Sequence, residues 1–187
     1  MTTTRVLLAY HSSEGQSARV AERIASVLRE EGASVEVFPT GAAPDPSGFD
    51  GVVLGDSIHA GRHSGALTHY VSAHVEQLNR MPVALFQVSL TSATDDAEHS
   101  VLAHDLLRKL LDETGLDPDL VGLFAGALAY TRYGWIKRRL MRSIARRQGV
   151  DTDMTRDHEY TDWDVVGEFA RDALEHIRRT NATLEFT

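Results

Sequence analysis

The sequence of 187 residues contains no cysteine. A chain without cysteine forms no disulfides, thiolate nucleophiles, thiolate metal sites or cysteine-ligated iron–sulfur clusters. Any redox chemistry must therefore come from a bound cofactor. Long apolar runs are also absent, because no stretch approaches the roughly 20 apolar residues of a membrane span. The N-terminus enters a strand-like run without the apolar region and cleavage site of a secretory signal, so we expect a soluble, cytoplasmic protein.

Lysine is scarce, since it occurs only at positions 109 and 137, and the net charge is −8. The charge is unevenly placed. Residues 132–149 carry seven positive charges and no acid, which leaves 12 positive residues against 27 acidic ones in the remainder. The strongly acidic remainder argues against nucleic acid as a partner.

The basic segment has helical periodicity and predicts an extra helix over about residues 133–149. Apolar side chains repeat every four residues on one face and arginines on another: Ile136, Leu140 and Ile144, against Arg138, Arg142 and Arg146. Such a helix packs on a sheet with its arginines solvated, lies on anionic lipid, or binds nucleic acid. The acidic remainder disfavours only the last of these alternatives.

Short, mostly apolar runs alternate with longer amphipathic ones along the chain. The runs that predict strands are residues 5–10, 34–38, 51–55, 83–89 and 120–128. The helical segments between and after them have their apolar faces within residues 20–28, 66–78, 101–111 and 166–177. Thr161 and Asp164 have capping-box spacing, which predicts the start of the last helix. The pattern is typical of right-handed βαβ units, and it predicts a single α/β domain over residues 1–187 with a doubly wound parallel sheet.

In doubly wound sheets, ligands bind beyond the carboxyl ends of the strands at the switch in strand order, so the loops found there are the candidate sites. The first such loop is "SSEGQS", Ser12 to Ser17, between the first strand and the first helix. Free N–H groups, the helix dipole and Gly15 favour a phosphate there, although Glu14 is an acid in the same loop. The lysine of the triphosphate-binding loop is missing. The alternative is a plain N-cap by Ser12 or Ser13.

Two further loops follow the third and fourth strands. "GDSIHAGRHSG" covers residues 55–65 and "SLTSATDDAE" covers residues 89–98. Glycines permit positive φ, so the first of these loops is suited to form a wall beside a flat ligand, and the second to form the opposite wall. The alternative for residues 55–65 is an ordinary connection in which Ser64 caps the next helix.

Nine histidines raise the question of a metal site. His59 and His63 lie in a glycine-containing loop without an evident carboxylate partner, and other pairs are five residues apart, off a shared helical face. We therefore expect no metal. A serine hydrolase is disfavoured too, because the sequence has no G-x-S-x-G elbow.

The order of these elements and loops resembles the flavodoxin family. "EGQS", "GDSIHAGRHS", "LNRMP", "AGALAYTRYGWIKR" and "YTDWDVVGEFAR" are also similar, in order and spacing, to stretches of one branch of it, the bacterial menaquinone-dependent protoporphyrinogen oxidases. The resemblance spans almost the whole chain. It implies a five-stranded sheet of order 2-1-3-4-5, bound FMN and an insertion after the fifth strand that contains the basic helix.

Carried onto this sequence, the resemblance implies three groups of FMN-binding residues. The phosphate loop comprises Ser12, Ser13, Glu14, Gly15, Gln16 and Ser17; one flavin wall comprises Ser57, Ile58, His59, Ala60 and Gly61; the other comprises Ser89, Leu90 and Thr91. This branch tends to have an arginine and an aromatic residue at the positions of His59 and Ala60, and an arginine at that of Ala129.

The implied activity is that of an FMN-dependent oxidoreductase of heme biosynthesis, which oxidises protoporphyrinogen IX and reduces a quinone. The flavin N5 carries the chemistry and the chain need supply no catalytic acid. Substrate candidates are Arg62 and Arg132, because guanidinium groups suit carboxylates, and Tyr130. Candidates for peripheral membrane contact are Trp135, Arg138, Arg142 and Arg146. The alternative is a flavodoxin-type electron carrier that docks on redox protein partners. An NAD(P)H-dependent quinone reductase is a third hypothesis, for which no nicotinamide fingerprint is present.

Overall fold

Parallel strands form the centre of the protein. The computed structural model describes residues 3–59, 61–90, 97–128, 142–143, 145–146, 152–153 and 155–184. Its five-stranded sheet comprises β1 (Arg5–Tyr10), β2 (Ser34–Pro39), β3 (Gly51–Ser57), β4 (Val83–Ser89) and β5 (Leu120–Ala125). The order is β2-β1-β3-β4-β5 and all neighbours are parallel, so the predicted fold is confirmed.

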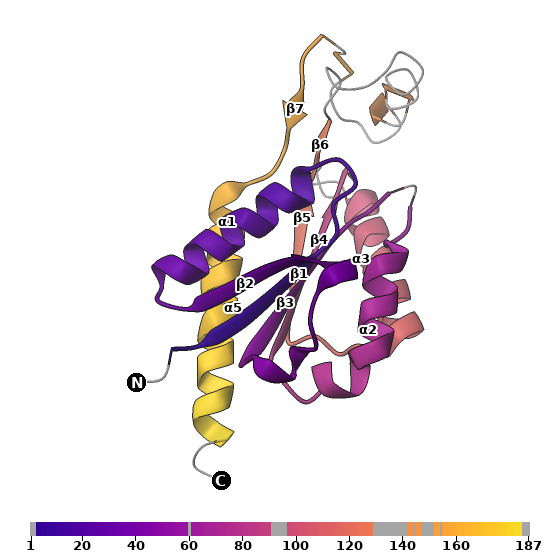
Figure 1. The fold of residues 1–187 in the computed structure, drawn as a ribbon. Helices are drawn as coiled ribbons and strands as arrows, with labels where there is room; N and C mark the ends of the chain where they lie inside the picture. Colours follow the sequence, from indigo (N-terminus) through magenta and orange to yellow (C-terminus); the bar gives the residue numbers. More distant parts are fainter. Residues whose placement is uncertain are drawn as a thin grey trace.

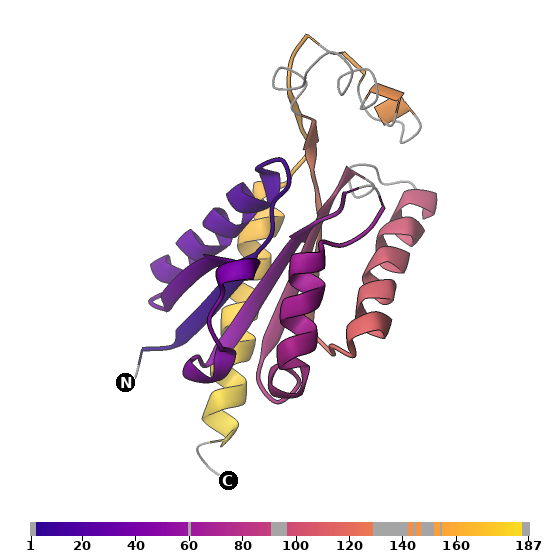
Figure 2. The same cartoon turned by 45° about the vertical axis from the view of Figure 1, so that its right-hand side comes forward.

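Helices cover both faces of this sheet (Figures 1 and 2). On one face lie α1 (Gln16–Glu30) and α5 (Trp163–Leu184), and on the other α2 (Gly65–Leu78) and α3 (Ala97–Thr114). The short 3-10 helices η1 (Thr40–Ala42) and η2 (Pro46–Gly48) follow β2. Ser64 Oγ accepts the N–H of Leu67 at 3.2 Å, so the expected cap of α2 is present.

Alternation along each strand produces two apolar layers. In β1, Val6 and Leu8 belong to the cluster under α1 and α5, whereas Leu7 and Ala9 belong to the cluster under α2 and α3. All four side chains are 0% exposed. Successive side chains point to opposite faces, so a strand buried on both faces must be apolar throughout. For this reason the continuous apolar runs in the sequence predict the buried strands.

Close packing constrains one glycine at the carboxyl end of β3. A Cβ on Gly55 would lie 2.0 Å from the ring of Phe86, so the aromatic ring occupies the space that any other residue needs. Phe86 in turn lies 6.1 Å from Phe124, and Phe124 meets Phe169 edge-to-face at 5.4 Å, as measured between ring centroids. This aromatic cluster ties β3, β4 and β5 to α5.

The predicted fifth strand is wrong in its second half. Residues 120–128 form two strands. The neighbouring strand β4 ends at Ser89, whose carbonyl accepts the N–H of Gly126 at 2.9 Å, and β5 ends at Ala125. After this glycine, β6 (Ala127–Leu128) pairs antiparallel with β7 (His158–Glu159). The two strands form a ribbon that projects from the carboxyl edge of the main sheet (Figure 1).

The predicted cap of the last helix is also wrong. Asp162 Oδ1 accepts the N–H groups of Asp164 and Val165 at 3.0 and 3.2 Å, so Asp162 caps α5. Thr161 instead donates its hydroxyl to Ala125 O at 2.7 Å. The Thr161 hydroxyl is thus bonded to the end of β5, and the cap is supplied by the next residue, Asp162.

The basic segment is described at only a few positions. Residues 142–143 and 145–146 are helical; Arg142 and Arg146 are exposed and Ala145 is buried. Tyr130, Arg132, Trp135 and Arg138 lie outside the described residues. Within the described ranges, no helix combines the length and apolar character needed to cross a membrane.

Candidate functional site

A pocket lies at the carboxyl edge of the sheet, between the loops after β1, β3 and β4. Its lining contains Ser12, Ser13, Glu14, Gln16, Ser17, Ser57, Ile58, His59, Val88, Ser89, Leu90, Gly126 and Ala127. Three loops that were predicted separately therefore converge. Of the other predicted cofactor residues, Gly15 and Gly61 belong to the same loops but do not line the pocket, and Ala60 and Thr91 lie outside the described residues.

The first loop ends in an unusual helix start. Gly15 is the N-cap of α1 with φ 96°, and no side chain in the described structure caps this helix. Ser12 Oγ accepts the N–H of Gly15 at 3.0 Å, which folds the loop back on itself. The plain N-cap by Ser12 or Ser13 therefore does not form. The dipole at this helix end favours an anion.

Ser17, in the first turn of α1, has a buried hydroxyl. Its side chain is 1% exposed, and its Oγ has no hydrogen-bond partner within the described part of the chain. Buried polar groups are normally paired, because an unpaired one has a desolvation penalty of about 1–3 kcal/mol. A ligand with oxygen acceptors at this point would satisfy the hydroxyl, so the loop fits a phosphate.

Ser57 joins the first two loops. Its Oγ accepts the N–H of Ser13 at 3.1 Å and lies 3.1 Å from Ser13 Oγ. The N–H of Ile58 donates to Val88 O at 2.9 Å, which aligns the ends of β3 and β4. These bonds hold the walls of the pocket in a fixed relation to each other.

The two ends of the turn after β3 line two different cavities. His59 and Arg62 exchange backbone hydrogen bonds of 3.1 and 3.2 Å, and Gly61 between them has φ 71°. His59 lines the pocket, whereas Arg62 lines a second cavity between α2 and α3, together with His69 and other residues. The structure therefore does not bring the substrate candidate Arg62 into the pocket lining.

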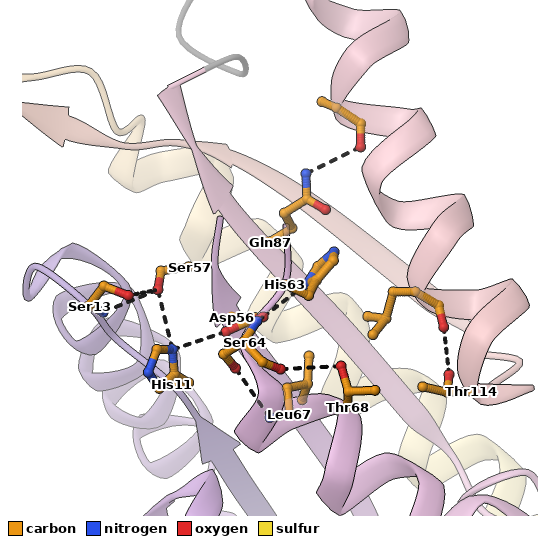
Figure 3. Close-up of polar contacts among 12 residues, drawn as sticks. His11, Ser13, Asp56, Ser57, His63, Ser64, Leu67, Thr68, Gln87 and Thr114 are labelled. Carbon is orange, nitrogen blue, oxygen red and sulfur yellow. Dashed lines mark hydrogen bonds and ion pairs between the residues drawn. The ribbon is translucent and has the colours of Figure 1, made fainter. Parts of the chain in front are cut away.

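A carboxyl group missed by the sequence analysis, that of Asp56, lies between His11 and His63, next in sequence to the pocket residue Ser57 (Figure 3). Asp56 is 0% exposed, and its Oδ2 accepts the N–H of Ser64 at 2.8 Å and lies 2.9 Å from His63 Nδ1. On its other side, Oδ1 is 3.3 Å from His11 Nδ1. The expectation that His63 has no carboxylate partner is wrong. The sequence did contain a signal for this contact, because Asp56 is an acidic residue at the end of an otherwise apolar strand.

His11 and His63 both direct Nδ1 toward the carboxyl group of Asp56. Among the described residues, no group of three or more histidine, aspartate or glutamate side chains is arranged to hold a metal ion. The cluster formed by His11, Asp56 and His63 is a buried carboxyl group with an imidazole nitrogen on either side.

A second missed network ties α1 to β7. Gln16 Nε2 donates to Glu159 Oε1 and to Thr161 Oγ1, both at 2.7 Å. Arg19 Nη1 donates to Glu159 Oε1 at 2.6 Å, and its guanidinium lies over the ring of Trp163, 5.2 Å from the centroid. These residues are about 140 positions apart in sequence, so local patterns carry no signal for the contact.

The pocket lining also contains Val88, Gly126 and Ala127, which the sequence analysis did not propose. A glycine inside a strand pattern often marks a close backbone approach, and a Cβ on Gly126 would lie 3.5 Å from the backbone of Ser89. Gly126, within the predicted strand of residues 120–128, was therefore the sequence signal for this part of the pocket.

A sheet of order 2-1-3-4-5 with a hydroxyl-lined pocket at its carboxyl edge defines a flavodoxin-type α/β protein. The chain belongs to the flavodoxin domain family, whose sequence profile matches residues 7–155. This membership indicates flavin binding. Two similar relatives are both named protoporphyrinogen IX dehydrogenase [quinone]. The protein from Escherichia coli K12 is 32% identical over 90% of this chain and 93% of its own length, and that from Leishmania major is 34% identical over 90% and 74%.

Solved structures support the fold. Oxidised flavodoxin 1 from Bacillus cereus has a TM-score of 0.56 at 19% identity and covers 92% of this chain and 99% of its own. A Fusobacterium nucleatum flavodoxin mutant bound to flavin mononucleotide has a TM-score of 0.53 at 12% identity, with coverage of 95% and 97%.

Proposed function

We propose that this protein is an FMN-dependent oxidoreductase that oxidises a protoporphyrinogen-type substrate and passes the electrons to a quinone. The activity is supported by the 32% and 34% identity to the two named dehydrogenases over 90% of the chain. The cofactor is supported by one observation above all: the buried Ser17 hydroxyl, in the first turn of α1, has no hydrogen-bond partner among the described residues.

The phosphate of FMN would be held by residues 12–17 and the flavin ring by residues 57–61 and 89–91. FMN supplies the acceptor for hydride or electrons when it is bound. The chain orients it through neutral donors and through the dipole of α1. Arg19, the arginine of the first turn, does not serve as a countercharge, because Glu159 binds its guanidinium.

The substrate side of the site would involve the segment that follows β6. Ala127 of β6 lines the pocket, and Tyr130 and Arg132 follow it closely in the sequence. We propose Arg132 and Tyr130 as contacts for an anionic substrate, because a guanidinium group binds carboxylates as a planar fork and a phenol hydroxyl can donate a hydrogen bond to them. Arg62 is left out of this proposal, because it lines the second cavity.

Peripheral membrane contact is a separate proposal, and it concerns the basic segment. Arg142 and Arg146 are exposed one helical turn apart, as a face directed at anionic lipid requires. Flotation with anionic liposomes should be lost when Arg138, Arg142 and Arg146 are changed to glutamate. Binding that survives this change would reject the lipid role.

The enzymatic proposal is tested with the purified chain, FMN, protoporphyrinogen and a menaquinone analogue. We expect FMN-dependent formation of protoporphyrin coupled to quinone reduction, and the same rate for Asp45→Asn, which changes a surface site remote from the pocket. Stoichiometric FMN without electron transfer between these substrates would reject the dehydrogenase and favour the electron carrier. A protein that binds no FMN would reject both.

A further inference from the structure

Two side chains in the first turn of α1 are occupied by partners within the protein. Gln16 lines the pocket, and its amide nitrogen donates to Glu159 Oε1 and to Thr161 Oγ1, both at 2.7 Å. An amide nitrogen has two hydrogens, so the Gln16 side chain has none left to donate to a cofactor. Its carbonyl oxygen Oε1 accepts Arg19 Nη1 at 3.2 Å. The Arg19 guanidinium therefore lies one side chain away from the pocket.

Glu159 is the acid that binds this arginine. Its Oε1 accepts Arg19 Nη1 at 2.6 Å, and its Oε2 lies 3.5 Å from Nη2. The ring of Trp163 lies against the same guanidinium, with its centroid 5.2 Å away. Among the described residues, no other acid forms an ion pair with Arg19. The positive charge next to the pocket is thus neutralised by one carboxylate, which reaches it from β7.

The position of this ion pair, at the start of a helix, gives it a second effect. A helix N-terminus carries partial positive charge, so an unpaired arginine is disfavoured there and an anion is favoured. Glu159 therefore stabilises the protein without its cofactor. A phosphate at the same helix end offers Arg19 another anionic partner, because a guanidinium fork suits phosphate as well as carboxylate. Glu159 and a phosphate thus compete for one cation.

The backbone holds Glu159 in place independently of its carboxylate. Glu159 pairs with Ala127 of β6, and Ala127 lines the pocket. Two residues later, the Thr161 hydroxyl donates to Ala125 O at 2.7 Å and accepts the Gln16 amide. Gln16 therefore keeps one of its partners when the carboxylate is removed. Replacing Glu159 should change the charge beside the pocket more than its shape.

We propose that Glu159 limits the affinity of the pocket for the phosphate of its cofactor, because it holds Arg19 in an ion pair on β7. Glu159 is a specificity-determining residue: it leaves neutral donors and the helix dipole, rather than a cation, to bind the phosphate. This inference rests on the proposed function, because the phosphate concerned is that of FMN. Removing the carboxylate should therefore tighten phosphate binding.

The test compares the dissociation constants of FMN and riboflavin for the wild type and Glu159→Ala. Riboflavin has no phosphate, so the ratio of the two constants measures the phosphate preference. Glu159→Ala should raise this preference about fivefold at low salt, as expected for one exposed charge pair. The gain should be lost in about 1 M salt, where the screening length is about 3 Å. The apoprotein of this variant should be less stable in denaturant titration, because Arg19 is then unpaired at the helix N-terminus.

Arg19→Gln provides the matched control. In a chain that already lacks this guanidinium, Glu159→Ala should raise the phosphate preference much less than it does in the wild-type background. Nitrogen NMR gives a readout of the arginine itself. In Glu159→Ala the Arg19 Nε–H signal, assigned from its absence in Arg19→Gln, should shift more with FMN than with riboflavin. In the wild type the two ligands should affect this signal alike.

The inference is overturned if Glu159→Ala leaves the phosphate preference unchanged or lowers it, because the carboxylate then has only a structural role. An equal rise in both backgrounds overturns it as well, since the carboxylate would then act without Arg19. Glu159→Gln keeps the shape and removes the charge, and it replaces Glu159→Ala in every comparison if circular dichroism shows that the alanine variant does not fold.

Failure of this inference is distinguishable from failure of the proposed function. A wild type that prefers FMN, together with either of these results for Glu159→Ala, rejects the inference alone. If the wild type binds FMN no more tightly than riboflavin, the proposed phosphate site is wrong and the inference fails with it.

Discussion

Gln16 Nε2 donates a hydrogen bond to Thr161 Oγ1 at 2.7 Å, across 145 residues of sequence. Gln16 belongs to the first turn of α1 and lines the pocket, and Thr161 stands just before α5. Thr161 in turn donates to Ala125 O at 2.7 Å, the last residue of β5. One buried hydroxyl therefore joins the phosphate loop, the end of the sheet and the returning chain.

Replacing this hydroxyl should loosen all three segments. Thr161→Val keeps the shape but leaves the Ala125 carbonyl and the Gln16 amide without this partner. We expect the free energy of unfolding to fall by about 1–3 kcal/mol, as measured by denaturant titration, and FMN affinity to fall with it. Thr161→Ser retains the hydroxyl and should stay close to the wild type. Equal stability of the two variants would contradict the role of this hydrogen bond.

Ser17→Ala should change stability and binding in opposite directions. Removing a buried hydroxyl that has no described partner relieves a desolvation cost, so the apoprotein should be as stable as the wild type or more so. FMN binding should weaken about tenfold, because a donor to a charged phosphate is lost. Calorimetric titration and thermal unfolding measure the two effects separately.

The matched comparison is Ser12→Ala, since Ser12 Oγ accepts the N–H of Gly15 at 3.0 Å. That variant should lose stability as well as affinity. Unchanged FMN affinity in Ser17→Ala would mean that the phosphate does not reach this hydroxyl.

Gly15→Val should abolish flavin binding while the fold persists. A Cβ at this position meets nothing within 4 Å, but the φ of 96° is strained for any other residue. The variant must relax the loop or bear a backbone penalty of about 1–2 kcal/mol. Gly41→Val, where a Cβ also meets nothing and φ is not positive, is the control and should bind FMN normally. Flavin retained by Gly15→Val would show that the phosphate has been placed in the wrong loop.

Asp56→Ala should be among the most destabilising single changes near the pocket. It leaves the Ser64 N–H and the His63 imidazole without their buried acceptor. Leaving a buried hydrogen-bonding group without its partner typically costs about 1–3 kcal/mol for each group. Asp56→Asn keeps an oxygen acceptor for Ser64 and should lose markedly less in denaturant unfolding. If the two variants lost stability equally, charge rather than hydrogen bonding would be the dominant contribution of Asp56.

Asp45 offers a test of acid stability outside the pocket. The Ser47 side chain and the Ser47 N–H hydrogen-bond its carboxylate and lower its pKa from 3.8 to about 2. A lowered pKa means that the stabilisation is present above pH 3.8 and is lost as the pH falls through about 2. Ser47→Ala should move the pKa back toward 3.8, as measured by carboxyl NMR titration. An unchanged titration curve would remove Ser47 as the principal cause.

Much of the fold could be predicted from the sequence, because the buried strands are apolar on both faces. Val6 to Ala9 divide between two layers, and such continuous apolar runs between helical segments have few other interpretations. The position at which β5 ends could not be predicted from the sequence. The apolar pattern continues through Gly126, but the neighbouring strand β4 ends at Ser89, so β5 has no strand beside it from that point on.

The loops of the site were predictable for a topological reason, since the switch in strand order fixes which loops meet. The side-chain pairs behind them were not. His63 reaches Asp56 only because the turn from His59 to Arg62 reverses the chain, and Gln16 reaches Glu159 only after the chain returns through β7. Such contacts depend on the three-dimensional path between the residues and leave no periodic trace in the sequence.

The contact between Gly55 and Phe86 has a consequence for redesigning this protein. Gly55 directly precedes Asp56 and Ser57, whereas Phe86 belongs to the aromatic cluster with Phe124 and Phe169. A larger residue at position 55 would displace a ring on which β4, β5 and α5 all pack. Mutant libraries aimed at a new ligand should therefore keep positions 55 and 86 fixed and vary the rim, because at this point the binding surface and the hydrophobic core cannot be altered independently.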